Sequence, residues 1–220
     1  MVMGGFMPIL RPRTMCVIGF PLLYIKCVFP GSLSLLEPTN DMPRFNSLFE
    51  LCFETIKKFK PSQLRLPLRR VASTSTEPPE AQYQDEFYHS LLAATSGNVR
   101  ISPEYASAQG ARVAGRIDFF IPIVKWGVEL TRNGNRLLEH VARFTDSGAY
   151  GAWLKSADMN DYILLDFWTK SLRDQHPCAN FILEIPNLYH VVFLSDHQEV
   201  QVYDNQLKVV KEPIALQENH

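Results

Sequence analysis

Two short segments with strand-like alternation, both within GRIDFFIPIVKWGVELTRNG (115–134), most limit the folds open to this chain. In residues 117–121 and again in residues 126–130, apolar side chains occupy every second position, as in strands that bury one face. Pro122 cannot donate to a central ladder of hydrogen bonds, so the turn between the segments is expected in residues 122–125. The sequence therefore predicts an antiparallel hairpin.

The register of this hairpin places two acids opposite each other. Pairing Ile121 with Trp126 across the turn also pairs Asp118 with Glu129, whereas a slip of one residue would bury Asp118 among apolar side chains. Side chains paired in this way lie on one face of the sheet, with β-carbons about 5 Å apart. Two carboxylates at that separation repel each other unless a cation or a shared proton intervenes. The sequence thus predicts that Asp118 and Glu129 hold a divalent metal: carboxylate oxygens suit Mg²⁺ or Ca²⁺, and the cofactor we expect is Mg²⁺ (or Mn²⁺).

The same pattern fits a second interpretation, in which the acids lie at a solvated strand end and pair with Arg116 or Lys125.

Upstream, the segment EAQYQDEFYHSLLAAT (80–95) predicts an amphipathic helix. Its apolar stripe consists of Tyr83, Phe87 and Leu91, which recur at helical spacing. Because successive helical residues turn by about 100°, Glu86 falls on the flank of this stripe. We therefore expect Glu86 to face a site beside the core.

These features resemble the PD-(D/E)xK nuclease-like superfamily, in which a strand Asp and a second-strand Glu hold the metal and a helical Glu supports its ligand shell. The corresponding residues in this chain are Asp118, Glu129 and Glu86. The segments EAQYQDEFY, GRIDFFIP, WGVELTRNGNRLLEHVARF and DYILLDF are similar, more specifically, to the C-terminal domain of fungal Crinkler-like effector proteins. This closer resemblance covers the chain from about Glu77 to the C-terminus.

The resemblance implies an α/β fold, namely a restriction-endonuclease-like mixed sheet flanked by helices, preceded by a helical segment. It also implies metal-dependent hydrolysis of phosphodiester bonds in nucleic acid, either DNA or RNA. A secreted effector that acts inside a host cell is implied as well, with the nucleus as one candidate compartment, although the N-terminus carries no clear signal peptide. The oligomeric state stays open.

One position departs from the superfamily pattern. The superfamily has a lysine two residues after the metal-binding Glu, where this chain has Thr131. Threonine cannot supply a cation, so either the role has moved or the domain is a catalytically inactive, nuclease-fold binding or effector module. The replacement cation would be Arg116, which lies opposite Thr131 in the predicted register, or Arg136 at the start of the next helix.

The segment NRLLEHVARF (135–144) predicts that next helix. Its packed face is expected to consist of four apolar residues, Leu137, Leu138, Val141 and Phe144. The other face would carry Arg136, Glu139, His140 and Arg143. Within it, Glu139 and Arg143 have the i,i+4 spacing of an ion pair. Because basic side chains beside the proposed site suit phosphate oxygens, the further candidates for phosphate contacts are Arg132, His140 and Arg143.

Three further strands are predicted in residues 161–167, 188–194 and 199–204. Asp166 and His190 lie inside the first two, and we interpret them as hydrogen-bonded core residues, since neither has a partner at a recognisable spacing. The sequence contains no GxxxxGK[ST], GxGxxG, HExxH or GxSxG element, so no nucleotide cofactor is predicted. Its four cysteines form no CxxC pair, which argues against a zinc ribbon or a disulfide scaffold.

Charge divides the chain into two parts. Residues 1–75 contain 10 Lys and Arg against 4 Asp and Glu, whereas residues 76–220 contain 12 against 19, a net charge of −7. That charge favours the inactive alternative, because it repels a polyanion unless the site is locally positive. We predict an uncertain leader, disordered or wrongly assigned to the gene, in 1–40, a helical remnant of an upstream module in 41–72, a linker in 73–79 and the nuclease-like domain, with its own core, in 80–220.

The apolar stretch MCVIGFPLLYIKCVF (15–29) bears on the membrane question. It is interrupted by Pro21 and Lys26 and is shorter than the roughly 20 residues that a membrane-spanning helix needs. No confident membrane span is therefore predicted, and the remaining candidate partner is nucleic acid.

Overall fold

The computed structural model describes residues 45–65, 78–106, 115–170, 172 and 185–218 of the chain. The described residues form one seven-stranded sheet with helices on both faces. In chain order the strands are β1 (Ser102–Tyr105), β2 (Ile117–Ile121), β3 (Trp126–Arg132), β4 (Asp161–Trp168), β5 (Leu188–Leu194), β6 (Glu199–Asp204) and β7 (Val209–Ala215). The predicted mixed α/β sheet flanked by helices is confirmed at this level.

The order of the strands across the sheet is their order in the chain. Strands β3, β4 and β5 are parallel to one another, while the pairs on either side, β1–β2–β3 and β5–β6–β7, are antiparallel. The register of the β2–β3 hairpin is the predicted one, because Ile121 pairs with Trp126 and Phe119 pairs with Val128. The three predicted downstream strands are present as β4, β5 and β6.

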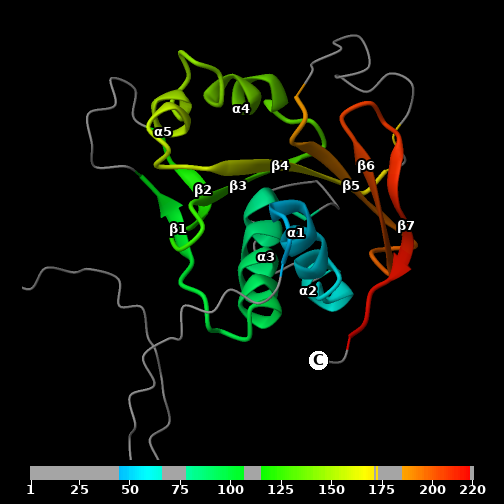
Figure 1. The fold of residues 1–220 in the computed structure, drawn as a ribbon. Coiled ribbons are helices and arrows are strands. Elements are labelled where there is room, and N and C mark those ends of the chain that lie inside the picture. Colours follow the sequence, from blue (N-terminus) through cyan, green and yellow to red (C-terminus); the bar gives the residue numbers. More distant parts are fainter. Residues whose placement is uncertain (1–44, 66–77, 107–114, 171, 173–184, 219–220) are drawn as a thin grey trace, which may run out of the picture. The chain divides into compact units, whose positions relative to one another are not determined.

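Five helices accompany the sheet in the described residues: α1 (Leu48–Ile56), α2 (Pro61–Arg65), α3 (Glu80–Ala94), α4 (Leu137–Arg143) and α5 (Gly151–Lys155). Figure 1 shows α1, α2 and α3 against one face of the sheet and α4 and α5 against the other. The connection from β3 to the parallel strand β4 runs through α4 and α5. It is this crossover that brings α4 over the strand that carries Glu129.

The main core lies between the sheet and α1 to α3. Ser47 caps the N-terminus of α1, and its side chain accepts a hydrogen bond from the backbone N–H of Glu50. From α3, Tyr83 stacks on Phe167 of β4, with 4.9 Å between the ring centroids. The predicted apolar stripe of α3 is confirmed, since its three members, Tyr83, Phe87 and Leu91, are fully buried.

Helices α1 and α2 belong to this same core. The apolar cluster that contains Tyr83 and Phe167 also contains Leu51 and Ile56 from α1 and Leu64 from α2. The described residues accordingly belong to one compact unit. Of the segment 41–72, expected to be a remnant of an upstream module, the described part, residues 45–65, contributes apolar side chains to the core of the sheet.

The other predicted boundaries fall mostly outside the described residues. The leader in residues 1–40 lies outside them, as does the linker except for its last two positions, Pro78 and Pro79. None of the helices in the described part of the chain combines the length and the apolar character needed to cross a membrane.

Candidate functional site

The alternation of side chains along β2 breaks at Asp118. Phe119 and Ile121 pack in the core on the α1–α3 side, as alternation requires. Ile117, however, packs with Phe120 in the cluster on the α4–α5 side, so neighbouring positions on either side of Asp118 face opposite ways. The carboxylate of Asp118 is directed at β3 and at helix α3, where its partners lie.

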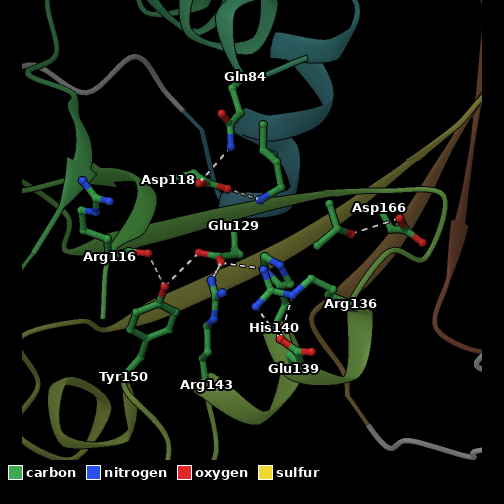
Figure 2. A network of polar contacts seen from close by, with 12 residues as sticks. Gln84, Arg116, Asp118, Glu129, Arg136, Glu139, His140, Arg143, Tyr150 and Asp166 are labelled. Atoms are coloured by element: carbon green, nitrogen blue, oxygen red, sulfur yellow. Dashed lines mark hydrogen bonds and ion pairs between the residues drawn. The ribbon is translucent and has the colours of Figure 1, made fainter. Parts of the chain in front are cut away.

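Both oxygens of Asp118 have partners. Oδ2 accepts a hydrogen bond of 2.7 Å from the backbone N–H of Leu130 on β3, and Oδ1 accepts one of 3.1 Å from the side-chain amide of Gln84 on α3. Figure 2 shows these two contacts above Glu129. The predicted register is thus confirmed but the predicted shared face is not, because Asp118 uses a ladder donor of the neighbouring strand.

Glu129 is buried on the α4–α5 side of the sheet, where three side chains converge on its carboxylate (Figure 2). Oε1 contacts Nδ1 of His140 at 2.8 Å and accepts a hydrogen bond from Nη1 of Arg143. Oε2 accepts a hydrogen bond of 3.1 Å from the hydroxyl of Tyr150. The buried charge of Glu129 is therefore balanced by a guanidinium and further satisfied by an imidazole and a phenol.

Two glycines allow the chain to place Tyr150 beside Glu129. A β-carbon on Gly148 would lie 2.1 Å from the carbonyl oxygen of Ala142, and one on Gly151 would lie 2.3 Å from that of Thr145. No residue with a side chain fits such contacts, so both glycines let the segment after α4 fold back against the helix. The hydroxyl of Tyr150 also donates to the carbonyl of Arg116, which ties this segment to the start of β2.

Asp118, unlike Glu129, borders an open cavity of about 800 Å³. Its lining combines basic side chains (Arg116, Arg136, His140, Arg143), acidic side chains (Glu80, Glu104, Asp118, Glu139), the amides Gln84 and Asn135, and Tyr150. Glu129 lies behind His140, Arg143 and Tyr150 and does not line the cavity itself. A polar cavity of this size, bordered by titratable groups, is the leading candidate for a functional site.

Two acids at the cavity, Asp118 and Glu80, have raised pKa values. Burial raises the pKa of Asp118 to about 8, and the charges of Glu129, Glu80 and Glu104 add to the rise, while the hydrogen bond from Leu130 opposes it. Burial also raises the pKa of Glu80. The pKa of the Tyr150 hydroxyl is raised by burial and by the charge of Glu129. Excess negative charge at this point of the sheet would be relieved by a proton or a cation.

The helical acid at the cavity is not the one expected from the sequence. Glu86 lies on the opposite flank of α3, where its carboxylate accepts a hydrogen bond of 2.7 Å from the backbone N–H of Lys60. Gln84 and Glu80, one turn apart, face the Asp118 cavity instead. Helical spacing placed Glu86 correctly beside the apolar stripe, but α1 and α2 cover that flank.

Helix α4 is rotated relative to the expected packing. His140 is buried and Leu138 is 46% exposed, whereas the sequence had suggested the reverse for both. Glu139 pairs with Arg136, at 2.5 Å from its Nη2, and not with Arg143. The physical reason is the buried charge of Glu129, which draws His140 and Arg143 toward the sheet.

The remaining predicted site residues are dispersed. Thr131 is fully buried and donates a 3.0 Å hydrogen bond to Asp166, so it is directed away from the cavity. Arg116, expected beside Thr131, pairs instead with Glu104 of β1 at 3.1 Å. Arg132 donates to the carbonyl of Pro78 and does not line the cavity.

Asp166 and His190 are core residues, as interpreted from the sequence. Asp166 accepts hydrogen bonds from the side chain of Thr131, the backbone N–H of Gly134 and the indole of Trp168, and its Oδ2 lies 3.2 Å from Nδ1 of His190. Both residues are fully buried. Their network fixes the turn that joins β3 to α4.

The sequence analysis missed five polar residues of the cavity: Glu80, Gln84, Glu104, Asn135 and Tyr150. The i,i+4 spacing of Glu80 and Gln84 was a usable signal, whereas nothing in the sequence around Tyr150 distinguishes it from a core tyrosine.

In the described part of the chain, no group of three or more His, Cys, Asp or Glu side chains is arranged to hold a metal ion. Comparisons of the chain with protein-family models, curated proteins and solved structures gave no match.

Proposed function

We propose that the cavity beside Asp118 hydrolyses phosphodiester bonds of nucleic acid with the help of Mg²⁺ or Mn²⁺. The observation that carries the proposal is the polar cavity at Asp118, where burial, with the charge of Glu129 added, raises the pKa of that acid to about 8. A buried acid close to a second negative charge attracts a proton or a cation. The resemblance to Crinkler-like effectors adds the proposal that this chemistry takes place inside a host cell.

The acidic side chains suit the coordination that Mg²⁺ usually has in proteins. Magnesium is typically held by one or two carboxylates and takes its other ligands from water and from substrate phosphates. Asp118 would supply a carboxylate at the cavity, because an ionised carboxylate offers about four lone pairs and its two described contacts leave some unused. Glu129, which lies behind His140, Arg143 and Tyr150, would join it as a ligand by giving up one of these contacts. When bound, the cation would lower the pKa of a water and offset charge on the phosphate.

The protein's own residues have separable roles in this proposal. His140 and Arg143 hold the Glu129 carboxylate in one orientation, and Tyr150 fixes its second oxygen. Gln84 and the Leu130 N–H orient Asp118 in the same way. Arg116 and Arg136 line the cavity and would offset charge that develops on the phosphate.

The test is cleavage of labelled single-stranded RNA and DNA by the full chain, with Mg²⁺, with Mn²⁺ and with a chelator. Asp118→Asn and Glu129→Gln should abolish cleavage, and Arg116→Ala should lower it while leaving the metal bound. Glu212→Gln, an exposed acid on β7, is the matched control for loss of one charge. Cleavage that survives both carboxamide variants would overturn the proposal.

A second candidate function is a catalytically inactive binding module of the same fold. It is favoured by the surroundings of Thr131, which stands where the superfamily has lysine, is buried against Asp166, and has no replacement lysine among the described cavity residues. Absence of both cleavage and Mg²⁺ or Mn²⁺ affinity in a folded chain would select this candidate.

A further inference from the structure

Two ion pairs stand at separate positions in the wall of the cavity. Nε of Arg116 lies 3.1 Å from Oε2 of Glu104, and Nη2 of Arg136 lies 2.5 Å from Oε2 of Glu139. All four residues line the cavity, and Figure 2 shows Arg116 and Arg136 on either side of Glu129. Their side chains are 55–67% exposed, so solvent screens both pairs. Neither arginine is bound tightly to its acid.

The backbone holds one member of each pair in an uncommon conformation. Glu104 has φ of 51° and Arg136 has φ of 52°, both in the left-handed region that residues with side chains seldom adopt. Backbone outliers of this kind concentrate at ligand sites. Here they occur in cavity-lining residues of two different elements, β1 and the turn before α4.

Arg143 differs from these two arginines. Its side chain is 29% exposed, about half as much as theirs, and its partner Glu129 is almost completely buried, so this pair is held against the interior. Displacing Arg143 would leave the charge of Glu129 without a counterion in the interior. The arginines that can change partner are therefore Arg116 and Arg136.

We propose that Arg116 and Arg136 bind phosphate groups of a short single-stranded segment of nucleic acid by exchanging Glu104 and Glu139 for the ligand. The proposal rests on the proposed function, since it assumes that the cavity serves phosphodiesters. Glu104 and Glu139 then compete with the ligand, because they form ion pairs with the two arginines when no ligand is bound. They set the affinity for phosphate without touching the scissile bond.

The size and charge of the cavity favour a short single strand over a duplex. Its volume of about 800 Å³ lies within the roughly 300–1,000 Å³ of small-ligand pockets, which suits one or two nucleotides. A duplex binds mainly through many phosphates over a broad basic surface. Four acidic side chains line this cavity against three arginines, and residues 76–220 carry a net charge of −7.

Binding of a short fluorescent oligonucleotide to the full chain in chelator tests the exchange without catalysis. Glu104→Gln and Glu139→Gln should each tighten binding about two- to fivefold, because each removes one weak competing ion pair. Arg116→Gln and Arg136→Gln should weaken binding and reduce the slope of log affinity against log salt by about 0.7 each. Glu212→Gln and Arg100→Gln, exposed and outside the cavity lining, are the matched controls.

The outcomes separate this inference from the proposed function. If the chain cleaves nucleic acid with Mg²⁺ but Glu104→Gln and Glu139→Gln bind the oligonucleotide no tighter than Glu212→Gln does, the exchange of partners is overturned. The proposed hydrolase activity then still stands. Tighter binding by the two Glu→Gln variants without any cleavage supports the exchange in an inactive module. Equal or stronger binding of a duplex of the same sequence, or no binding of the single strand, overturns the proposed ligand.

Discussion

Oε1 of Glu129 on β3 and Nδ1 of His140 on α4 lie 2.8 Å apart inside the protein. Glu129 is the most enclosed member of its network, and every partner comes from the chain that follows β3. The strand acid and the helix are therefore mutually dependent. The buried charge of Glu129 requires the His140 and Arg143 side chains of α4, and that charge in turn sets the orientation of α4.

Loss of the Glu129 charge should destabilise the fold. Glu129→Gln leaves the Arg143 guanidinium without its counterion, and we expect a decrease of about 2–4 kcal/mol in the free energy of unfolding. Urea denaturation of the full chain measures it. Glu139→Gln removes a solvent-exposed acid of α4 and should leave the free energy of unfolding nearly unchanged. Equal stability of both variants would contradict the buried network.

The pH dependence of stability should carry the signature of Asp118. Its pKa in the folded chain is about 8 against an ordinary value of 3.8, so the folded state holds a proton that the unfolded state has lost between these values. Stability from this group is complete below about pH 4 and decreases toward pH 8, by at most about 1.4 kcal/mol per pH unit. Asp118→Asn should remove that decrease. Parallel pH profiles for parent and variant would refute it.

Divalent cations should stabilise the folded chain most at alkaline pH. Above the pKa of Asp118 the carboxylate is ionised and repelled by neighbouring acids, whereas near pH 5 a proton occupies it and competes with the metal. Thermal unfolding with and without Mg²⁺ should show a concentration-dependent rise in Tm near pH 8 and a smaller one near pH 5. The rise should be absent in Asp118→Asn; the same rise in that variant would place the cation elsewhere.

Two adjacent leucines test the orientation of α4. Leu137 is buried in a cluster with Leu164 and Leu188, so Leu137→Ala should cost about 2–4 kcal/mol of stability. Leu138 is 46% exposed, and Leu138→Ala should change stability by about 0.5 kcal/mol or less. Chemical denaturation of the pair compares the same substitution at neighbouring positions. A larger effect at Leu138 would favour the orientation expected from the sequence.

Removal of α1 and α2 should prevent cooperative folding. A chain that begins near residue 75 lacks Leu51, Ile56 and Leu64, each of which is buried in the main core. We expect such a chain to bind hydrophobic dyes and to lose a sharp unfolding transition, as measured by calorimetry. A cooperative transition matching that of the full chain would show that residues 80–220 have a complete core.

Local sequence patterns were sufficient to predict the β2–β3 hairpin but not the orientation of the helices that pack on it. Alternation and Pro122 predicted the pairing of Ile121 with Trp126, because both act within one short segment. The orientation of α4 depends on the buried charge of Glu129 on β3, and the spacing of apolar residues within α4 cannot reveal a charge on another element. Glu86 shows the same limit: its angle on the helix was right, but the helices that cover that flank come from a segment assigned to another module.

The position of Glu129 in the chain also constrains the order of events during synthesis. A β2–β3 hairpin that emerged from the ribosome ahead of residues 140–150 would have to bury an acid before any of its partners existed. We therefore expect the hairpin to close against the rest of the sheet only after Tyr150 has been translated and can reach Glu129. A pause in translation before that residue would keep the Glu129 carboxylate exposed to solvent.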